Sequence, residues 1–309
     1  MSAFFGLVRA ELLQHRAGML ITPAAIALLI GVFFTSQLIF NTGGFDLTLG
    51  DVVVQVGDNT VLNQEAAERG GAAIAATFGF IAIPIFLVAN VVSFFVMLSA
   101  LYEERSERTI LFFKSMPISD TQSVLAKYVT AAFIGPLIAI IVMMLLSAVL
   151  SLVSAAAFSM RGASEAWYYL GKLPLLKLFI SYSGYYTLYS LWLAPIFAYL
   201  LMVSSLAPRS PFLCALLPVA IIAIAEIILL NSSRFLSEIY ERITVTRLGE
   251  VLARSRGWEP DREQRTLENF FIRFSDFLTA GVFPTFWAGI VIAALFLCVA
   301  IWARGRKTL

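Results

Sequence analysis

Six long stretches of the chain are apolar, and polar segments separate them. These stretches are 17–45, 70–102, 128–160, 178–208, 210–233 and 277–303, and only the fifth holds a charged residue, Glu226. A helix needs about 20 residues to cross the hydrocarbon core of a bilayer, which is about 30 Å thick. Each stretch is long enough, so the pattern predicts an all-α integral membrane protein with six transmembrane helices.

The predicted boundaries give one transmembrane domain that covers residues 1–309. We expect the six spans at 17–40, 73–101, 124–153, 178–207, 211–231 and 279–303. Four segments connect them on the two sides, namely an outer loop at 41–72, a region at 102–121, an outer loop at 154–177 and an outer helical insert at 232–276. Residues 304–309 form a short tail. Within the first outer loop, β-branched runs on either side of Gly57-Asp58-Asn59 predict a short hairpin.

Two polar segments have the periodicity of amphipathic helices. In residues 1–16 the apolar residues fall at helical spacing and the charged residues lie off that stripe, which predicts a helix in the membrane interface. The apolar positions are Phe4, Phe5, Val8, Leu12 and Leu13, and the charged ones are Arg9, Glu11 and Arg16. The insert at 232–276 is predicted to form two amphipathic helices that Gly257 and Pro260 separate.

Composition narrows the class of protein. Hydrophobic residues make up 60% of the chain and charged residues 14%, against about 45–50% and about 25% in soluble domains, so a soluble globular protein is excluded. The net charge of +2 gives no reason to expect a nucleic-acid partner. The chain has one histidine, two cysteines and no phosphate-binding loop of the Gly-x-x-x-x-Gly-Lys-Ser/Thr type. We therefore expect no catalytic residues, no metal site and no bound cofactor, so that the chain is not itself an enzyme.

Basic residues suggest an orientation for the predicted spans. With the N-terminus inside, ten of the 22 basic residues are cytoplasmic, and eight of the other twelve lie in the long segment 234–273. Short loops set topology more strongly than long ones, and among the short loops the tally is ten to four. We expect both termini in the cytoplasm and the protein in the inner (plasma) membrane.

The segment after the second predicted span is the most informative. It reads Leu101-Tyr-Glu-Glu-Arg-Ser-Glu-Arg-Thr-Ile-Leu-Phe-Phe-Lys-Ser-Met-Pro-Ile-Ser119 and opens with five charges in six residues, 103–108. Pro117 disfavours helix at the preceding residue, and Ser119 or Asp120 can then cap the third span. Taken alone, these residues also fit a solvated charged loop that is anchored at the interface.

The run Glu-Arg-x-Glu-Arg-Thr-Ile…Ser-x-Pro-Ile-Ser resembles the coupling-helix region of ABC-2 type transporter permeases. The wider layout is similar too, with an N-terminal elbow helix, six spans and an outer insert before the last span. The resemblance covers nearly the whole chain in order, although only residues 103–119 match a specific motif. The chain departs from the family in Arg108, where many members carry glycine, and in its sizeable first outer loop.

The resemblance implies a permease that works with a separate cytoplasmic ATPase subunit and with a second permease copy or a homologous permease, in contact with membrane lipid. ATP and magnesium would bind to the partner ATPase, and export is the direction expected. The residues implied to couple with the ATPase are Glu103, Glu104, Arg105, Glu107, Arg108, Thr109, Phe112, Phe113 and Pro117. A secondary transporter and a non-catalytic membrane scaffold subunit are the alternatives.

Several polar residues within the spans are candidates for the substrate path, and each has a structural alternative. Glu226 either lines the path or lies near the outer interface, because an ionised acid in the membrane needs a cavity or a polar partner. Asn90 is either a substrate ligand or an interhelical hydrogen-bonding residue. Tyr182, Tyr185, Tyr186 and Tyr189 share one helical stripe, which suits either an aromatic wall for an amphipathic substrate or an interfacial aromatic belt.

The predicted topology can be tested by labelling single cysteines. Cysteines introduced at Asn59 and Gly257 should react with an impermeant reagent from outside, and one at Ser115 should react only after permeabilisation. The reverse pattern would overturn both the orientation and the assignment of the coupling segment.

Overall fold

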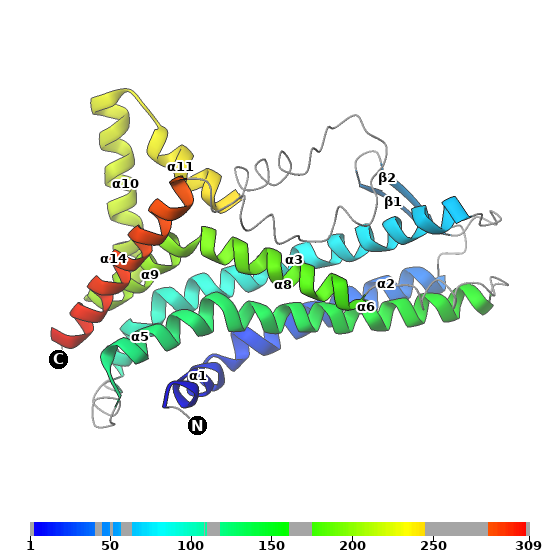
Figure 1. Ribbon diagram of the computed structural model, residues 1–309, viewed down its shortest axis with the longest axis horizontal. Coiled ribbons are helices and arrows are strands. Elements are labelled where there is room, and N and C mark those ends of the chain that lie inside the picture. The colour runs from blue at the N-terminus through cyan, green and yellow to red at the C-terminus, as the bar shows by residue number, and fades with distance from the viewer. Residues whose placement is uncertain are drawn as a thin grey trace.

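A computed structural model describes residues 3–40, 45–49, 52–56, 64–107, 109, 118–160, 175–244 and 284–306. Most of this part of the chain is helical (Figure 1). The helices are α1 (Ala3–Gln14), α2 (Thr22–Phe40), α3 (Gln64–Ser106), α5 (Asp120–Val129), α6 (Gly135–Met160), α8 (Leu175–Trp192), α9 (Ala194–Leu206), α10 (Pro211–Leu230), α11 (Arg234–Thr244) and α14 (Pro284–Arg306). One turn of π-helix, Ala17–Ile21, precedes α2, and another, Thr130–Ile134, joins α5 to α6.

The apolar helices identify a multi-pass membrane protein. Five are long and apolar enough to cross a membrane, at Ala17–Ser36, Pro84–Ser106, Asp120–Ala157, Pro211–Leu230 and Pro284–Arg306. A bent pair, Phe179–Trp192 with Ala194–Leu206, brings the number to six if it counts as one span. The six predicted spans correspond to these segments. Helix α3, which contains the second of these spans, is longer than the predicted span and is already helical at Gln64.

The fourth predicted span, 178–207, is two helices and not one. The chain bends by 58° between α8 and α9, at Leu193. Pro195 lies in the first turn of α9 and has no backbone N–H to donate. Its ring would also clash with the carbonyl four residues earlier, so a continuous helix across this position is disfavoured.

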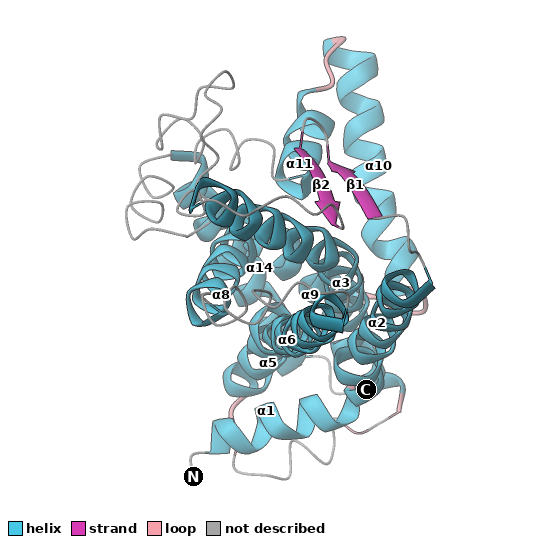
Figure 2. Cartoon of the chain, turned by 90° about the vertical axis from the view of Figure 1, so that its right-hand side faces the viewer, coloured by secondary structure: helices cyan, strands magenta, loops and turns pink. Residues whose placement is uncertain are grey.

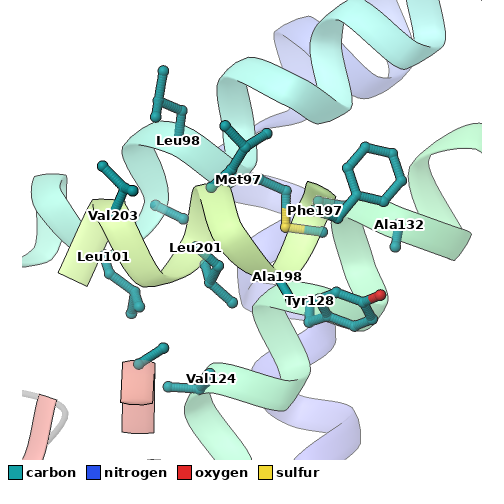
Figure 3. Packing of buried hydrophobic residues seen from close by; sticks show 14 of the residues in the cluster. Met97, Leu98, Leu101, Val124, Tyr128, Ala132, Phe197, Ala198, Leu201 and Val203 are labelled. Atoms are coloured by element: carbon teal, nitrogen blue, oxygen red, sulfur yellow. The ribbon is translucent and has the colours of Figure 1, made fainter. Parts of the chain in front are cut away.

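Helix α9 forms the centre of the packed core, where it lies against α3, α5 and α14. Figure 3 shows Met97, Leu98 and Leu101 of α3 in one buried cluster with Phe197 and Leu201 of α9. Small residues bring the helices close together, since Ala198 and Ala300 are fully buried. Close approach of small residues is a common way to pack helices in a membrane.

Helix α10 contrasts with α9, because it projects away from the other helices in both views (Figures 1 and 2). Apart from Glu226 near its end, its side chains are apolar, and most of them are exposed. Only Ala215 and Ala223 are buried. An apolar helix without a polar face suits a surface that lipid or another protein covers.

The predicted first outer loop contains two paired strands, but the pairing differs from the predicted hairpin. Strands β1 (Phe45–Leu49) and β2 (Val52–Val56) pair antiparallel, with Phe45 opposite Val56 and Leu49 opposite Val52. The predicted turn at Gly57-Asp58-Asn59 therefore follows the second strand. The β-branched run 52–54 forms a strand as predicted. Its partner is the strand that precedes it in the sequence, whereas the prediction paired it with residues that follow it.

The outer insert is described only in its first part. Helix α11 is strongly amphipathic and agrees with the first of the two predicted helices. Residues 245–283, which include the second predicted helix and the break at Gly257 and Pro260, lie outside the described residues.

Candidate functional site

The N-terminal helix α1 lies across one end of the bundle, where the other helices are seen nearly end-on (Figure 2). Leu7 and Val8 are buried and pack against Ala126 of α5. Phe5 and Leu13, which the sequence assigned to the apolar face, are exposed. Glu11, which was predicted to lie off the buried stripe, is 4% exposed. The sequence thus identified the helix correctly and placed Glu11 on the wrong side of it.

Helix α5 begins with a capping box that confirms the predicted cap at Ser119. The Ser119 hydroxyl oxygen accepts a hydrogen bond from the Gln122 N–H, and the Gln122 side chain accepts one from the Ser119 N–H. This cap fixes where the helix starts. It therefore also fixes the positions of Asp120 and Lys127 along the helix. These two residues are two turns apart and so lie on the same face of α5.

Lys127 is the centre of a buried group of charges. Its side chain is 1% exposed, and its Nζ lies 2.6 Å from Glu11 Oε1 and 3.1 Å from Glu104 Oε1. Glu11 comes from α1, Glu104 from the last turns of α3 and Lys127 from α5. One ammonium group therefore joins three helices, and Glu11 of α1 is more than 90 residues away in sequence from Glu104 of α3.

Arg304 extends this group to the last helix. Its Nη2 lies 3.2 Å from Glu104 Oε2, to which the Nε also donates, and its Nη1 pairs with Asp120. The Arg304 side chain is 4% exposed, whereas that of Asp120 is 30% exposed. We call Glu11, Glu104, Asp120, Lys127 and Arg304 the charge cluster.

The charge cluster joins α1, α3, α5 and α14 at one end of the bundle. An ion taken out of water is strongly unfavourable unless a partner of opposite charge and further hydrogen bonds compensate it. Here Glu104 contacts both Lys127 and Arg304. Separating either cation from Glu104 would therefore expose a buried charge or leave it without its partner. The four helix segments are thereby held in one arrangement.

The predicted coupling residues next to Glu104 differ from one another in what they contact and in how exposed they are. Arg105 donates to the carbonyl oxygens of Ser204 (2.7 Å) and Ala207 (3.0 Å), at the end of α9. A cation at this place satisfies carbonyls that the helix end leaves free. The Thr109 hydroxyl donates to the Glu104 carbonyl at 3.3 Å. Glu103 is half-buried and Glu107 is exposed.

Glu104 is the predicted coupling residue that the structure places differently. The resemblance implied a carboxylate at an interface with another subunit, but its side chain is only 2% exposed and is engaged within this chain. The Glu104 carboxylate is therefore paired with Lys127 and Arg304 of the same chain. The remaining coupling candidates, Arg108, Phe112, Phe113 and Pro117, lie outside the described residues.

The tyrosines predicted as candidates for the substrate path pack against other aromatic rings. Tyr186 is buried and stacks on Phe86 of α3 at 5.9 Å between ring centroids, and it also meets Tyr189 edge-on at 5.8 Å. Tyr182 packs on the same phenylalanine at 6.2 Å. These rings pack α8 against α3, which favours a role in helix packing over an aromatic wall.

Asn90 lies on α3, one turn after Phe86, and bonds within its own helix. Its Nδ2 donates to the Phe86 carbonyl at 2.9 Å. Its Oδ1 is buried and has no hydrogen-bonding partner among the described residues. The predicted interhelical hydrogen bond of Asn90 is not formed among the described residues.

Glu226 caps the helix that follows it. Its Oε1 accepts hydrogen bonds from the Ser232 hydroxyl and the Arg234 N–H, and its Oε2 accepts one from the Phe235 N–H at 2.9 Å. A carboxylate is well suited to this position, because the first N–H groups of a helix have no partners inside it. This contact favours the interfacial alternative for Glu226 over a place on the substrate path.

Lys127 and Arg304 were not among the residues that sequence analysis selected. Both lie within two or three residues of a predicted span end, where basic residues ordinarily face the headgroups. The one signal that could have identified them is the presence of acids close to span ends at the same predicted membrane face, namely Glu11, Glu104 and Asp120. Pairing them requires contacts over 116 and 200 residues of sequence.

The chain matches no protein-family model, no curated protein and no solved structure. Within the described ranges, no group of three or more His, Cys, Asp or Glu side chains is placed to hold a metal ion. Among the described residues, the charge cluster is the largest group of buried, paired charges.

Lys127→Met should destabilise the protein strongly, because it leaves the buried carboxylates of Glu11 and Glu104 without their shared cation. Breaking a buried ion pair from one side costs about 3–5 kcal/mol. The measurement is thermal or SDS unfolding of the purified protein in detergent, with Arg9→Met, an exposed cation on α1, as the control. Equal stability of the two variants would show that the charge cluster contributes little to the fold.

His15 should make the joint between α1 and the bundle sensitive to acid. Burial lowers the pKa of His15; Glu11, 3.9 Å away, raises it and Lys127 lowers it. The unfolded chain therefore binds the proton more readily below about pH 6.5, and stability falls as the pH decreases through this range. His15→Gln should reduce this pH dependence of unfolding. If the stability of the variant and of the wild type fell equally with decreasing pH, His15 would not be the source of the acid sensitivity.

Proposed function

We propose that the chain is the membrane-spanning permease subunit of an ABC transporter, and that the segment between α3 and α5 couples it to a separate ATPase subunit. The observation that carries the proposal is the position of this segment. It begins directly after Glu104 and ends at the Ser119 cap, so both of its ends are attached to the charge cluster. The resemblance of residues 103–119 to a coupling helix supports the same assignment.

The proposed coupling acts through rigid attachment. A force on the segment 107–119 reaches α3 through Glu104 and α5 through Asp120, and both side chains contact Arg304 of α14. Lys127 passes the same displacement to α1 through Glu11. A partner that moves this segment would therefore move four helix ends together. Such a connection converts closure of an ATPase into rearrangement of the spans.

The other parts of the proposal follow from the permease assignment. ATP and magnesium bind to the cytoplasmic ATPase subunit, and this chain contributes no catalytic residue. A second permease copy or a homologous permease completes the translocation pathway, and export is the direction. The exposed apolar surface of α10 is suited to contact with lipid or with this second permease. The protein lies in the inner (plasma) membrane with both termini in the cytoplasm.

A secondary transporter is the second candidate, and one observation favours it. Such transporters bind substrate at discontinuous helices, and the α8–α9 pair is bent by 58°. They also show corresponding breaks in two repeated halves. The proline inside α3, Pro84, and the one inside α10, Pro218, leave their helices continuous. The bend therefore has no counterpart among the described helices.

Docking of the ATPase tests the proposed function directly. Phe112→Ala or Phe113→Ala should weaken recovery of the partner ATPase in a pull-down from membranes by roughly tenfold or more, because an apolar anchor in an interface can contribute 2 kcal/mol or more. Glu107→Lys, at an exposed position, should have a smaller effect, since a single rim charge usually contributes little.

The control for docking is Tyr240→Ala, on the exposed surface of α11, far in sequence from the proposed contact. Each variant is first checked for insertion and for unfolding temperature. Wild-type recovery of the ATPase by both phenylalanine variants would reject the coupling assignment. Transport that persists without any ATPase would instead support the secondary transporter.

A further inference from the structure

The break between α8 and α9 frees a backbone carbonyl inside the protein. In a continuous helix the Trp192 carbonyl would accept a hydrogen bond from the Ile196 N–H. Here the Ile196 N–H donates to the Leu193 carbonyl at 2.9 Å, and the Phe197 N–H donates to that same oxygen at 3.1 Å. The Trp192 carbonyl thus loses its helical partner, and a buried carbonyl without a partner is unfavourable.

Arg242 of α11 supplies the missing donor. Its Nη1 donates to the Trp192 carbonyl oxygen at 3.0 Å, and its Nη2 donates to the Thr285 carbonyl oxygen at 2.9 Å. Thr285 lies in the first turn of α14. One guanidinium therefore joins the end of α8 to the start of α14.

The same guanidinium lies over the indole ring of Trp192, 5.0 Å from the ring to the central carbon. Arginine is suited to this place because its planar fork reaches two acceptors and its face stacks on an aromatic ring. Lysine offers a single ammonium and cannot reproduce both contacts.

Gly289 of α14 provides the space that this arrangement needs. A Cβ atom at position 289 would lie 2.7 Å from Arg242 Nη1 and 3.1 Å from Nη2. These separations are shorter than van der Waals contact, so any larger residue would require the guanidinium to shift from this position. The end of α8, helix α11 and the first turns of α14 therefore meet at the Arg242 side chain.

The N-terminal end of α11 is held by a different set of contacts. Glu226 caps its first turn, and Asn231 adopts the left-handed conformation, with φ 47°, that turns the chain from α10 into α11. Arg242 lies seven residues after Phe235, two helical turns along. No residue of α11 is buried, so the helix is held from the surface at its two ends.

We propose that Arg242 is a clasp through which α11 holds the α8–α9 break in its bent form. When Arg242 is engaged, the freed carbonyl of Trp192 is satisfied and the bend is locked to the start of α14. When it is released, α11 separates from α14 and the bend is no longer held. The amphipathic helix thereby controls the shape of a span to which it does not belong. This inference does not depend on the proposed function.

Two spin-label pairs test the clasp in the full chain, reconstituted in nanodiscs, with Cys214 and Cys298 replaced by alanine. The first pair, at Tyr240 and Leu295, reports the separation of α11 from α14, and the second, at Ile180 and Arg209, reports the bend. All four positions are exposed. Wild type should give one narrow distance distribution for each pair.

Gly289→Ala is the decisive variant, because it removes no polar group and introduces the better helix former. We expect a second, longer distance at the first pair, a shifted distance at the second pair, and an increase of roughly tenfold or more in the detached population. Arg242→Met should do the same, and Arg242→Lys should fall between them. Gly305→Ala, in the same helix, is the matched control, since its Cβ would meet only Asp120 Oδ2, at 3.6 Å.

Two outcomes overturn the clasp. One is unchanged distances at both pairs in Gly289→Ala. The other is a change at the first pair alone, which would mean that α11 leaves while the bend stays as it was. Neither result depends on ATPase docking, so failure of the clasp is distinct from failure of the proposed function.

Discussion

The ammonium of Lys127, buried between the carboxylates of Glu11 and Glu104, is the contact on which the arrangement of the bundle end depends. In a chain that is 60% hydrophobic, a charge inside the protein persists only where an opposite charge meets it. That requirement determines where α1, α3, α5 and α14 end relative to one another. Apolar packing alone tolerates sliding between helices, whereas buried ion pairs are favourable only when the charged groups keep their contact geometry.

The sequence predicted the spans well because their signal is local. A run of about 20 apolar residues is sufficient to identify a membrane helix, and the Ser119 cap is readable from a few neighbouring residues. The partners of the charges were not predictable in this way. Helical periodicity placed Glu11 off the apolar stripe, but it cannot tell which face of a helix meets protein, and the contact that buries Glu11 involves a residue 116 positions away.

Glu226 and Arg242 illustrate a second constraint, which is that backbone groups freed at a helix end or break require partners. Glu226 binds the first N–H groups of α11, and Arg242 binds the carbonyl that the α8–α9 break leaves free. The sequence indicated that Glu226 needed a cavity or a polar partner. It gave no indication that one amphipathic helix would connect the two sites, because that connection exists only in the folded chain.

A double-mutant cycle between Glu11 and Arg304 tests most directly whether the charge cluster acts as one unit. Glu11 bonds to Lys127, and Arg304 bonds to Glu104 and Asp120. Unfolding free energies are measured for Glu11→Gln, Arg304→Gln and the double variant. Residues in one ionic network couple by about 0.5–3 kcal/mol, and we predict a coupling in this range. Effects that add within about 0.3 kcal/mol would contradict the account, because independent pairs cannot hold four helices as one body.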